Sequence, residues 1–401
     1  MKTQTSDLAT FVPNKELPIY NWFYYKEGYS RDLVMMLLDR HIGQQNSSDT
    51  SPKASASVLD PFCGVGTTNL ACKERGIDSY GFDVSPLAIL AARTKTYDYD
   101  TDELKAAIKQ VEKSKFLRQD LRTVPGEVRR YFNPHTLEDV IFFGKQMQDF
   151  EGQAHDFLKL GLMTSTTRCS WMYKDGAVLK VRKKPVPTFR KFYIRTLWKM
   201  LSDFQRMQEN FASKPCQTFI DEGDARHLKL DSQFIDLVIT SPPYLNKIEY
   251  TKIYSVEEFL FFGDPIEKRG MRAFIGLDAA DAEPIFPELP PIANAYFADM
   301  KQVLANLRRA CKPGAKVCIV VGDGCLPDWP ASAGEQPDWP ASAGRQTGGV
   351  VHVDSLLPQL AEKEGFSLEN VEILGVRQCT RNRVEKIGRM EEVLITLERD
   401  N

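Results

Sequence analysis

Residues 58–68 read VLDPFCGVGTT and carry the clearest indication of the fold class. It begins as an apolar strand, passes through a turn that contains two glycines, and continues into a helical pattern that reaches about Arg75. A second apolar run follows and ends at Phe82 and Asp83. A strand, a tight turn, a helix and another strand in this order make a βαβ unit. The sequence therefore predicts an α/β fold built on parallel strands.

Strand patterns resume far along the chain and indicate a larger sheet. Apolar runs at 217–221, 234–240 and 316–322 are each followed by a loop and a helical pattern. Two further β-rich runs, 371–378 and 392–398, are separated by a charged turn, as in an antiparallel hairpin. We expect one interrupted, mostly parallel sheet that ends in this hairpin.

A helical insertion separates the two parts of the predicted sheet. Apolar residues at a helical spacing mark 102–115, 135–150 and 190–211, and only 177–182 has a strand pattern there. A tandem repeat at 326–346, LPDWPASAGE followed by QPDWPASAGR, is expected to be an exposed loop without a function of its own. We divide the chain into residues 1–96, with the N-terminal segment and the first half of the sheet, 97–213, the helical insertion, and 214–401, the second half of the sheet.

Charge is distributed unevenly along the chain. The formal net charge is -2, so nucleic-acid binding requires a local basic surface. Residues 156–214 contain 13 Lys and Arg against 4 Asp and Glu, which gives this part a net charge of +9. The basic insertion is therefore the candidate target-recognition region, and the alternative is a solvated helix face without a ligand. Phosphate contacts are expected from Lys180, Arg182, Lys183 and Lys184.

Composition argues against several classes of protein. The chain has no apolar run of 18 residues, and its first residues lack the basic-then-apolar order of a secretory signal, so we expect a cytoplasmic protein. Eight cysteines are scattered without a C-x-x-C pair, and only five histidines are present. We therefore expect no metal site, and we interpret the cysteines as small, buried apolar groups.

The glycine turn forms one half of a predicted ligand site. Gly64 and Gly66 allow the backbone to turn tightly against a ligand, but Asn69 stands where the dinucleotide fingerprint needs a third glycine, so a nicotinamide cofactor is disfavoured. Asp83 ends the second strand, the position from which a carboxylate reaches ribose hydroxyls. Asp224 follows the third strand and suits an adenine amino group. Each acid alone has helix capping as an alternative role, but together they predict an adenosine-type ligand.

The other half of the site is the strand that ends in Ser241-Pro242-Pro243-Tyr244. The two prolines end the strand. An exocyclic amino group is a poor nucleophile because its lone pair is delocalised into the base. Hydrogen bonds to the Ser241 hydroxyl and the Pro242 carbonyl would localise that lone pair, and Tyr244 would stack on a base flipped out of the duplex. A rigid turn without chemistry is the alternative.

Together these motifs resemble those of the amino-group DNA methyltransferases, which modify cytosine N4 or adenine N6. The resemblance rests on DPFCGVGTT at 60–68, GFD at 81–83, GDA at 223–225, TSPPY at 240–244, and YYKEGYS at 24–30, which looks like the family's N-terminal cofactor motif. It implies a Rossmann-like methyltransferase fold with a seven-stranded sheet, and S-adenosyl-L-methionine as the cofactor. The residues implied to bind this cofactor are Tyr25, Lys26, Asp60, Phe62, Gly64, Gly66, Thr67, Thr68, Asp83 and Asp224.

The resemblance also implies an activity. Ser241, Pro242, Pro243 and Tyr244 match the family's catalytic motif, and serine in its first position favours cytosine N4 over adenine N6. The implied function is site-specific methylation of double-stranded DNA with a flipped target base, in a restriction-modification system with a cognate restriction endonuclease as partner. No membrane contact is expected. The insertion between the second and third strands departs from the family's common layouts.

Three other functions fit parts of the sequence. Cys216 lies in a Pro-Cys-Gln triplet that matches the nucleophile motif of C5-cytosine methyltransferases. However, Cys216 lies at the start of the third strand, whereas C5 methylation needs the cysteine after the fourth strand. An RNA amino-group methyltransferase is a second alternative, although the sequence shows no separate RNA-binding module. A non-catalytic nucleic-acid-binding subunit is the third, and the intact turn glycines, Asp83 and the Ser-Pro-Pro-Tyr motif argue against it.

Overall fold

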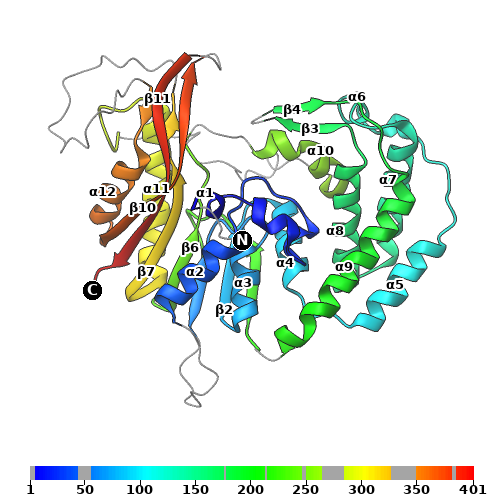
Figure 1. Cartoon of the computed structure of the whole chain (residues 1–401), viewed down its shortest axis with the longest axis horizontal. Helices are drawn as coiled ribbons and strands as arrows, with labels where there is room; N and C mark the ends of the chain where they lie inside the picture. The colour runs from blue at the N-terminus through cyan, green and yellow to red at the C-terminus, as the bar shows by residue number, and fades with distance from the viewer. Residues whose placement is uncertain are drawn as a thin grey trace.

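The computed structural model describes residues 5–43, 56–175, 178–212, 215–245, 250–263, 284–326, 349–381 and 385–401. The tandem repeat lies outside the described residues, apart from Leu326 at its start. Figure 1 shows two lobes: one is built around the sheet and is called the α/β lobe, and the other consists mainly of helices and is called the helical lobe.

The α/β lobe is built around one sheet that has seven strands among the described residues, in the order β10-β11-β7-β6-β1-β2-β5. Pairing is parallel from β7 through β6, β1 and β2 to β5, whereas β11 runs antiparallel to its neighbours β7 and β10. The predicted α/β class, mostly parallel sheet and C-terminal hairpin are therefore confirmed. The strands are β1 (Ser57–Asp60), β2 (Asp78–Asp83), β5 (Thr218–Glu222), β6 (Ile235–Thr240), β7 (Cys311–Gly322), β10 (Phe366–Arg381) and β11 (Glu385–Arg399).

Helices cover both faces of the sheet, because its central strands are apolar on both sides. In β6, Leu237 and Ile239 pack with α2 and α3 on one face, whereas Val238 packs with α11 and α12 on the other. Side chains alternate between the faces of a strand, so a strand that is buried on both faces appears in the sequence as a continuous apolar run. The helices of this lobe are α2 (Arg31–His41), α3 (Thr67–Arg75), α4 (Pro86–Thr96), α11 (Pro291–Ala310) and α12 (Val353–Lys363).

The helical lobe shares one apolar core with α4 and the N-terminal segment. The three predicted helices of the insertion are present, but α8 was not predicted. Leu158 and Leu162 lie one turn apart, but Leu160 between them is also buried, so the helix lacks the single apolar face by which a one-sided helix is recognised. None of the helices in the described part of the chain is long and apolar enough to span a lipid bilayer. The elements are α5 (Thr101–Lys113), η3 (Leu121–Thr123), α6 (Gly126–Arg129), α7 (Pro134–Gln146), η4 (Met147–Asp149), α8 (Gly152–Arg168), α9 (Phe189–Ala212) and α10 (Tyr250–Phe262).

A two-stranded hairpin interrupts these helices. Strands β3 (Met172–Asp175) and β4 (Val178–Val181) pair antiparallel, and Figure 1 shows them beside α10 at the top of the helical lobe. Only the second strand was predicted, because β3 has the mixed sequence Met-Tyr-Lys-Asp and contains no apolar run. The hairpin is called the β3–β4 ribbon below.

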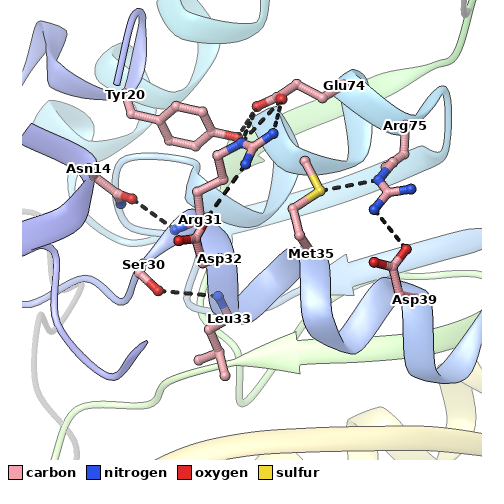
Figure 2. Close-up of polar contacts among 10 residues, drawn as sticks. All are labelled: Asn14, Tyr20, Ser30, Arg31, Asp32, Leu33, Met35, Asp39, Glu74 and Arg75. Atoms are coloured by element: carbon pink, nitrogen blue, oxygen red, sulfur yellow. Dashed lines mark hydrogen bonds and ion pairs between the residues drawn. The ribbon is translucent and has the colours of Figure 1, made fainter. Parts of the chain in front are cut away.

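The N-terminal segment is held to α3 by polar contacts, which Figure 2 shows. Glu74 on α3 accepts a hydrogen bond from the Tyr20 hydroxyl at 2.6 Å and another from the Arg31 guanidinium at 2.6 Å. Ser30 caps α2 by accepting a hydrogen bond from the backbone N–H of Leu33 at 3.2 Å. These contacts fix the segment relative to the helix that follows the glycine turn. The segment contains α1 (Thr5–Leu8), η1 (Val12–Glu16) and η2 (Tyr20–Trp22).

Two cysteines differ from the sequence-based expectation. Cys325 and Cys379 form a disulfide with a Cα–Cα distance of 5.6 Å. The interpretation of all eight cysteines as apolar packing groups was therefore wrong for this pair. The two residues are 54 positions apart, in the short strand β8 (Gly324–Cys325) and in β10, so no local spacing in the sequence marks them as a pair.

Candidate functional site

A pocket lies at the carboxyl edge of the sheet, where β1, β2, β5 and β6 end. Ligands of open α/β sheets bind in the crevice at this edge. The structure brings to this pocket nine residues that were predicted to bind the cofactor or to act in catalysis. They are Tyr25, Asp60, Phe62, Gly64, Thr67, Asp83, Asp224, Ser241 and Pro243. Gly66, Thr68, Pro242, Tyr244 and the exposed Lys26 are not part of its lining.

The buried carboxylate of Asp60 joins three segments that are distant in the sequence. It accepts hydrogen bonds from the Thr240 hydroxyl at 2.7 Å, the Tyr29 hydroxyl at 2.7 Å and the backbone N–H of Phe62 at 3.2 Å. The Tyr29 hydroxyl also contacts that of Thr68. Burial raises the pKa of Asp60, and the hydrogen bonds oppose this rise. The N-terminal segment, the glycine turn and the end of β6 therefore meet at one acid.

The glycine turn has the backbone conformation that only glycine adopts without strain. Gly64 has φ +50°, and Gly66, which precedes α3, has φ +76°. A Cβ atom on Gly66 would lie 2.8 Å from the Cβ atom of Ala92 on α4. A Cβ atom on Gly64 would lie 3.5 Å from the ring of Tyr25, in ordinary contact. Gly66 is therefore required for helix packing, whereas Gly64 faces the pocket.

Asp83 holds two loops at the pocket, the glycine turn and the loop that leads into α4. Its carboxylate accepts a hydrogen bond from the backbone N–H of Gly64 at 3.0 Å and another from that of Ser85 at 2.9 Å. Ser85 in turn caps α4. Burial raises the pKa of Asp83 to about 6, although these backbone hydrogen bonds oppose the rise. The side chain is thus ionised at neutral pH and takes up a proton under mildly acidic conditions.

Asp224 lines the pocket, but its carboxylate is already engaged. The Arg226 side chain donates from Nε to Oδ1 at 3.0 Å and from Nη2 to Oδ2 at 2.6 Å, and also contacts Asp299 on α11. Burial alone would raise the pKa of Asp224, but the hydrogen bonds from Arg226 outweigh burial and the pKa is lowered. Asp224 could therefore act as the predicted acceptor for an adenine amino group only while it is also paired with Arg226.

The residues of the Ser-Pro-Pro-Tyr motif point in different directions. Ser241 and Pro243 line the pocket, whereas Tyr244 is half-buried and turned toward β11. The Tyr244 hydroxyl donates a hydrogen bond to Glu392 at 2.9 Å. A Cβ atom on Gly322, the last residue of β7, would lie 3.0 Å from the Tyr244 ring. The ring therefore rests on a glycine at the end of the neighbouring strand.

An aromatic wall closes the pocket on the side of the helical lobe. The ring of Tyr25 stacks on that of Tyr254 on α10, with ring centroids 5.0 Å apart. The Tyr254 hydroxyl donates a hydrogen bond to Glu27 at 2.8 Å, and the Lys174 ammonium lies 3.4 Å above the Tyr254 ring. Lys174 also pairs with the buried Glu257 at 2.9 Å. The β3–β4 ribbon, α10 and the pocket are thus in direct contact through side chains.

Several residues of the site were not among the predicted site residues, and Tyr29, Glu27 and Thr240 are three of them. Tyr29 and Glu27 line the pocket. Both lie in the YYKEGYS motif at 24–30, and this motif was the sequence feature from which they could have been predicted. Thr240 bonds to Asp60 because β1 and β6 are neighbours in the sheet and their ends meet. That adjacency depends on the strand order, which the sequence does not display.

The predicted DNA-binding residues lie on and after the β3–β4 ribbon and are all exposed. Lys180 pairs with Asp175 across the ribbon at 2.6 Å. Arg182 lies 5.5 Å from the centroid of the Tyr173 ring, and Lys183 lies 5.4 Å from that of Trp171. Lys184 is the fourth member of this group. Cys216 lies at the opposite end of β5 from the pocket, which argues against its role as a nucleophile.

Comparison with known proteins gives relatives of one kind. No family model matches the chain. Type II methyltransferase M.BsoBI of Geobacillus stearothermophilus is 23% identical over 483 aligned positions, covering 98% of this chain and 87% of that protein. The chain is therefore distantly similar to type II methyltransferases. Type II methyltransferase M.MjaII of Methanocaldococcus jannaschii is 21% identical and covers 75% of this chain and 71% of its own length.

Other matches are shorter or structural. Type II methyltransferase M.AvaI of a Nostoc species is 25% identical over 62% of this chain, which spans 55% of that protein. A SAM-dependent methyltransferase from Methanosarcina mazei matches 87% of this chain and 94% of its own at 10% identity and a TM-score of 0.30. The [4+2]-cyclase SpnF matches 99% and 97% at 9% identity and a TM-score of 0.34.

Replacing Gly66 tests the packing of the glycine turn. We expect Gly66→Ala to lower the free energy of unfolding by about 2–4 kcal/mol, because a positive φ and a contact with Ala92 oppose the new methyl group. Gly144→Ala on α7 is the matched control: a Cβ atom there meets nothing within 4 Å, and we expect it to be neutral or to stabilise by up to about 1 kcal/mol. Urea denaturation measures both, and equal stability of the two variants would contradict this packing.

Proposed function

We propose that this chain is a DNA methyltransferase that transfers the methyl group of S-adenosyl-L-methionine to N4 of cytosine at specific sites in double-stranded DNA. The observation that carries the proposal is that Ser241 and Pro243 line the same pocket as Gly64 and Asp83. The similarity to type II methyltransferases supports it. By that similarity the chain would act in a restriction-modification system together with a cognate endonuclease.

The residues of the pocket fit S-adenosyl-L-methionine. Gly64 leaves room for a ligand against the backbone, and Asp83 offers an acceptor for ribose hydroxyls. Glu27 has one carboxylate oxygen that is buried and has no hydrogen-bond partner within the described part of the chain, and burial raises its pKa. An ammonium group such as that of the methionine moiety would satisfy this oxygen. When bound, the cofactor supplies an electrophilic methyl group on sulfur.

The residues of the chain would hold the amino nitrogen of the target base with its lone pair directed at the pocket. In the proposed mechanism the Ser241 hydroxyl and the Pro242 carbonyl accept hydrogen bonds from the amino group of the base. These hydrogen bonds localise the lone pair on the amino nitrogen, where it is no longer delocalised into the ring. Thr240, one residue earlier, is fixed by its hydrogen bond to Asp60. The Tyr244 ring, held by Glu392, would stack on the flipped base and fix its plane.

The identity of the product tests the proposal. We expect the purified protein, incubated with labelled S-adenosyl-L-methionine and unmethylated genomic DNA, to yield N4-methylcytosine when the DNA is digested to nucleosides and analysed by mass spectrometry. Ser241→Ala should abolish that product without loss of cofactor binding. N6-methyladenine would move the assignment to adenine, C5-methylcytosine would overturn the amino-group chemistry, and label found only in an RNA substrate would overturn the DNA assignment.

Asp83 and Tyr244 should separate cofactor binding from catalysis. We expect Asp83→Ala to weaken cofactor affinity more than it lowers kcat, and Tyr244→Ala to lower kcat by about 10–100-fold with a smaller effect on cofactor affinity, because the two side chains act on different ligands. Tyr244→Phe keeps the stacking face and should retain most activity. Calorimetric titration and single-turnover rates measure the two effects, and parallel losses in both variants would contradict these roles.

The pKa of Asp83 adds a dependence on pH to the same measurement. An ionised carboxylate accepts a hydroxyl hydrogen bond better than a neutral one, and burial raises this pKa to about 6. Cofactor affinity should therefore be constant above about pH 7 and weaken as the pH falls through 6. In the Asp83→Asn variant this weakening should be absent.

The basic side chains after β4 form the proposed DNA-binding surface. Lys180, Arg182, Lys183 and Lys184 are exposed, and Arg182 and Lys183 lie near aromatic rings of the same ribbon, which limits their freedom. A two-stranded ribbon is one of the elements that fit the major groove. We therefore propose the 97–213 insertion as the target-recognition region.

Removing two of these charges tests this surface. We expect Lys183→Ala combined with Lys184→Ala to weaken DNA binding and to reduce the slope of log affinity against log salt by about 1–2, because each lost phosphate contact removes about 0.9 from that slope. Cofactor affinity should be unchanged. The exposed Lys229→Ala, outside the insertion, is the control. Fluorescence anisotropy with a DNA duplex gives both quantities, and an unchanged salt slope would place the DNA elsewhere.

A further inference from the structure

A second cluster of metal-ligating side chains lies outside the pocket, at the end of β7. Asp323 directly follows β7, and the short strands β8 and β9 (Val350–Val351) pair antiparallel just beyond it. This pairing brings His352 and Asp354, at the start of α12, next to Asp323. One ligand atom from each of the three residues lies within 4.8 Å of the other two.

The distances within this cluster leave room for an ion between the three side chains. His352 Nδ1 lies 3.4 Å from a carboxylate oxygen of Asp323 and 3.8 Å from one of Asp354. An N–H···O hydrogen bond is shorter, about 2.7–3.2 Å. In a tetrahedral zinc site with bonds of about 2.0–2.1 Å, neighbouring ligand atoms are about 3.3–3.4 Å apart. The imidazole is therefore too far from either acid for a good hydrogen bond but close to the spacing that a shared ion imposes.

The electrostatics of the cluster favour a cation. The side chain of Asp323 is 0% exposed, and its Oδ1 has no hydrogen-bond partner among the described residues. Its Oδ2 accepts a hydrogen bond from the backbone N–H of Glu391 at 2.9 Å, which fixes the carboxylate in place. Burying an ionised carboxylate without full compensation is costly, and a second acid, Asp354, lies beside the same imidazole. A divalent ion would offset the buried charge of Asp323.

We propose that Asp323, His352 and Asp354 form a binding site for a divalent ion of the zinc class. One imidazole nitrogen and two carboxylate oxygens suit Zn²⁺ better than Mg²⁺ or Ca²⁺, which prefer oxygen ligands alone, and a water molecule would complete the tetrahedron. The ion would tie the end of β7 to the start of α12, one residue after the glycine on which Tyr244 rests. The cysteine pattern predicted no metal site, and these ligands form no local motif because 28 residues separate Asp323 from His352.

Titration of the chelator-treated full-length protein with zinc chloride tests the site. We expect one ion per chain and a higher melting temperature with zinc than with EDTA. Asp323→Asn and His352→Gln should each weaken binding by at least about tenfold, since losing even an outer-shell partner costs that much. The controls are His227→Gln and Asp98→Asn, which replace exposed residues of the same types outside the cluster. Cobalt(II) absorption in the visible range should report a four-coordinate site that the two ligand variants lack.

Three outcomes would overturn the proposal. The first is no heat of binding with zinc chloride at about 50 μM, which would leave His352 as an ordinary ion-pair partner of the two acids. The second is equal zinc affinity of the wild type and the combined Asp323→Asn, His352→Gln variant, each checked for native circular dichroism. The third is loss of binding in a Cys325→Ser, Cys379→Ser variant, which would assign the ion to thiolates of the reduced cysteine pair. Retained binding in that variant supports the carboxylate–imidazole site.

Discussion

The hydrogen bonds to the buried carboxylate of Asp60 are the interaction on which the rest of the site depends. They join the end of β1 to the end of β6 through Thr240 and to the N-terminal segment through Tyr29. A carboxylate with three protein donors in a buried position has few alternative arrangements, because leaving any donor unsatisfied is costly. The glycine turn and the Ser-Pro-Pro-Tyr motif are therefore held at one edge of the sheet, although 180 residues separate Asp60 from Thr240.

Much of the fold could be predicted from the sequence, and the errors have physical causes. The central strands were recognisable because both of their faces are buried, so that each is a short apolar run between turns. Helix α8 was missed because its neighbours bury it on more than one side, and β3 because a ribbon that stands away from the core needs no apolar face. The disulfide between Cys325 and Cys379 depends on a contact between β8 and β10, which leaves no local pattern.

The lining of the candidate pocket could be predicted in part, but its geometry could not. Nine of the proposed residues line one pocket, because strand ends with small, acidic or proline residues meet at the carboxyl edge of a parallel sheet. The sequence did not indicate that Arg226 occupies the carboxylate of Asp224, or that Tyr244 turns toward Glu392. Both depend on side chains from distant elements, and the position of those elements follows from the whole fold.

The aromatic wall has a consequence for the energetics of the two ligands. Lys174 of the β3–β4 ribbon covers the ring of Tyr254, which stacks on Tyr25 of the pocket, so two side-chain contacts separate the ribbon from the pocket. A duplex that shifts the ribbon and a small molecule that contacts Tyr25 would both change the arrangement of the stacked rings of Tyr25 and Tyr254. If both ligands bind there, their binding free energies would be linked, and such a linkage is reciprocal: each ligand would change the affinity for the other by the same factor.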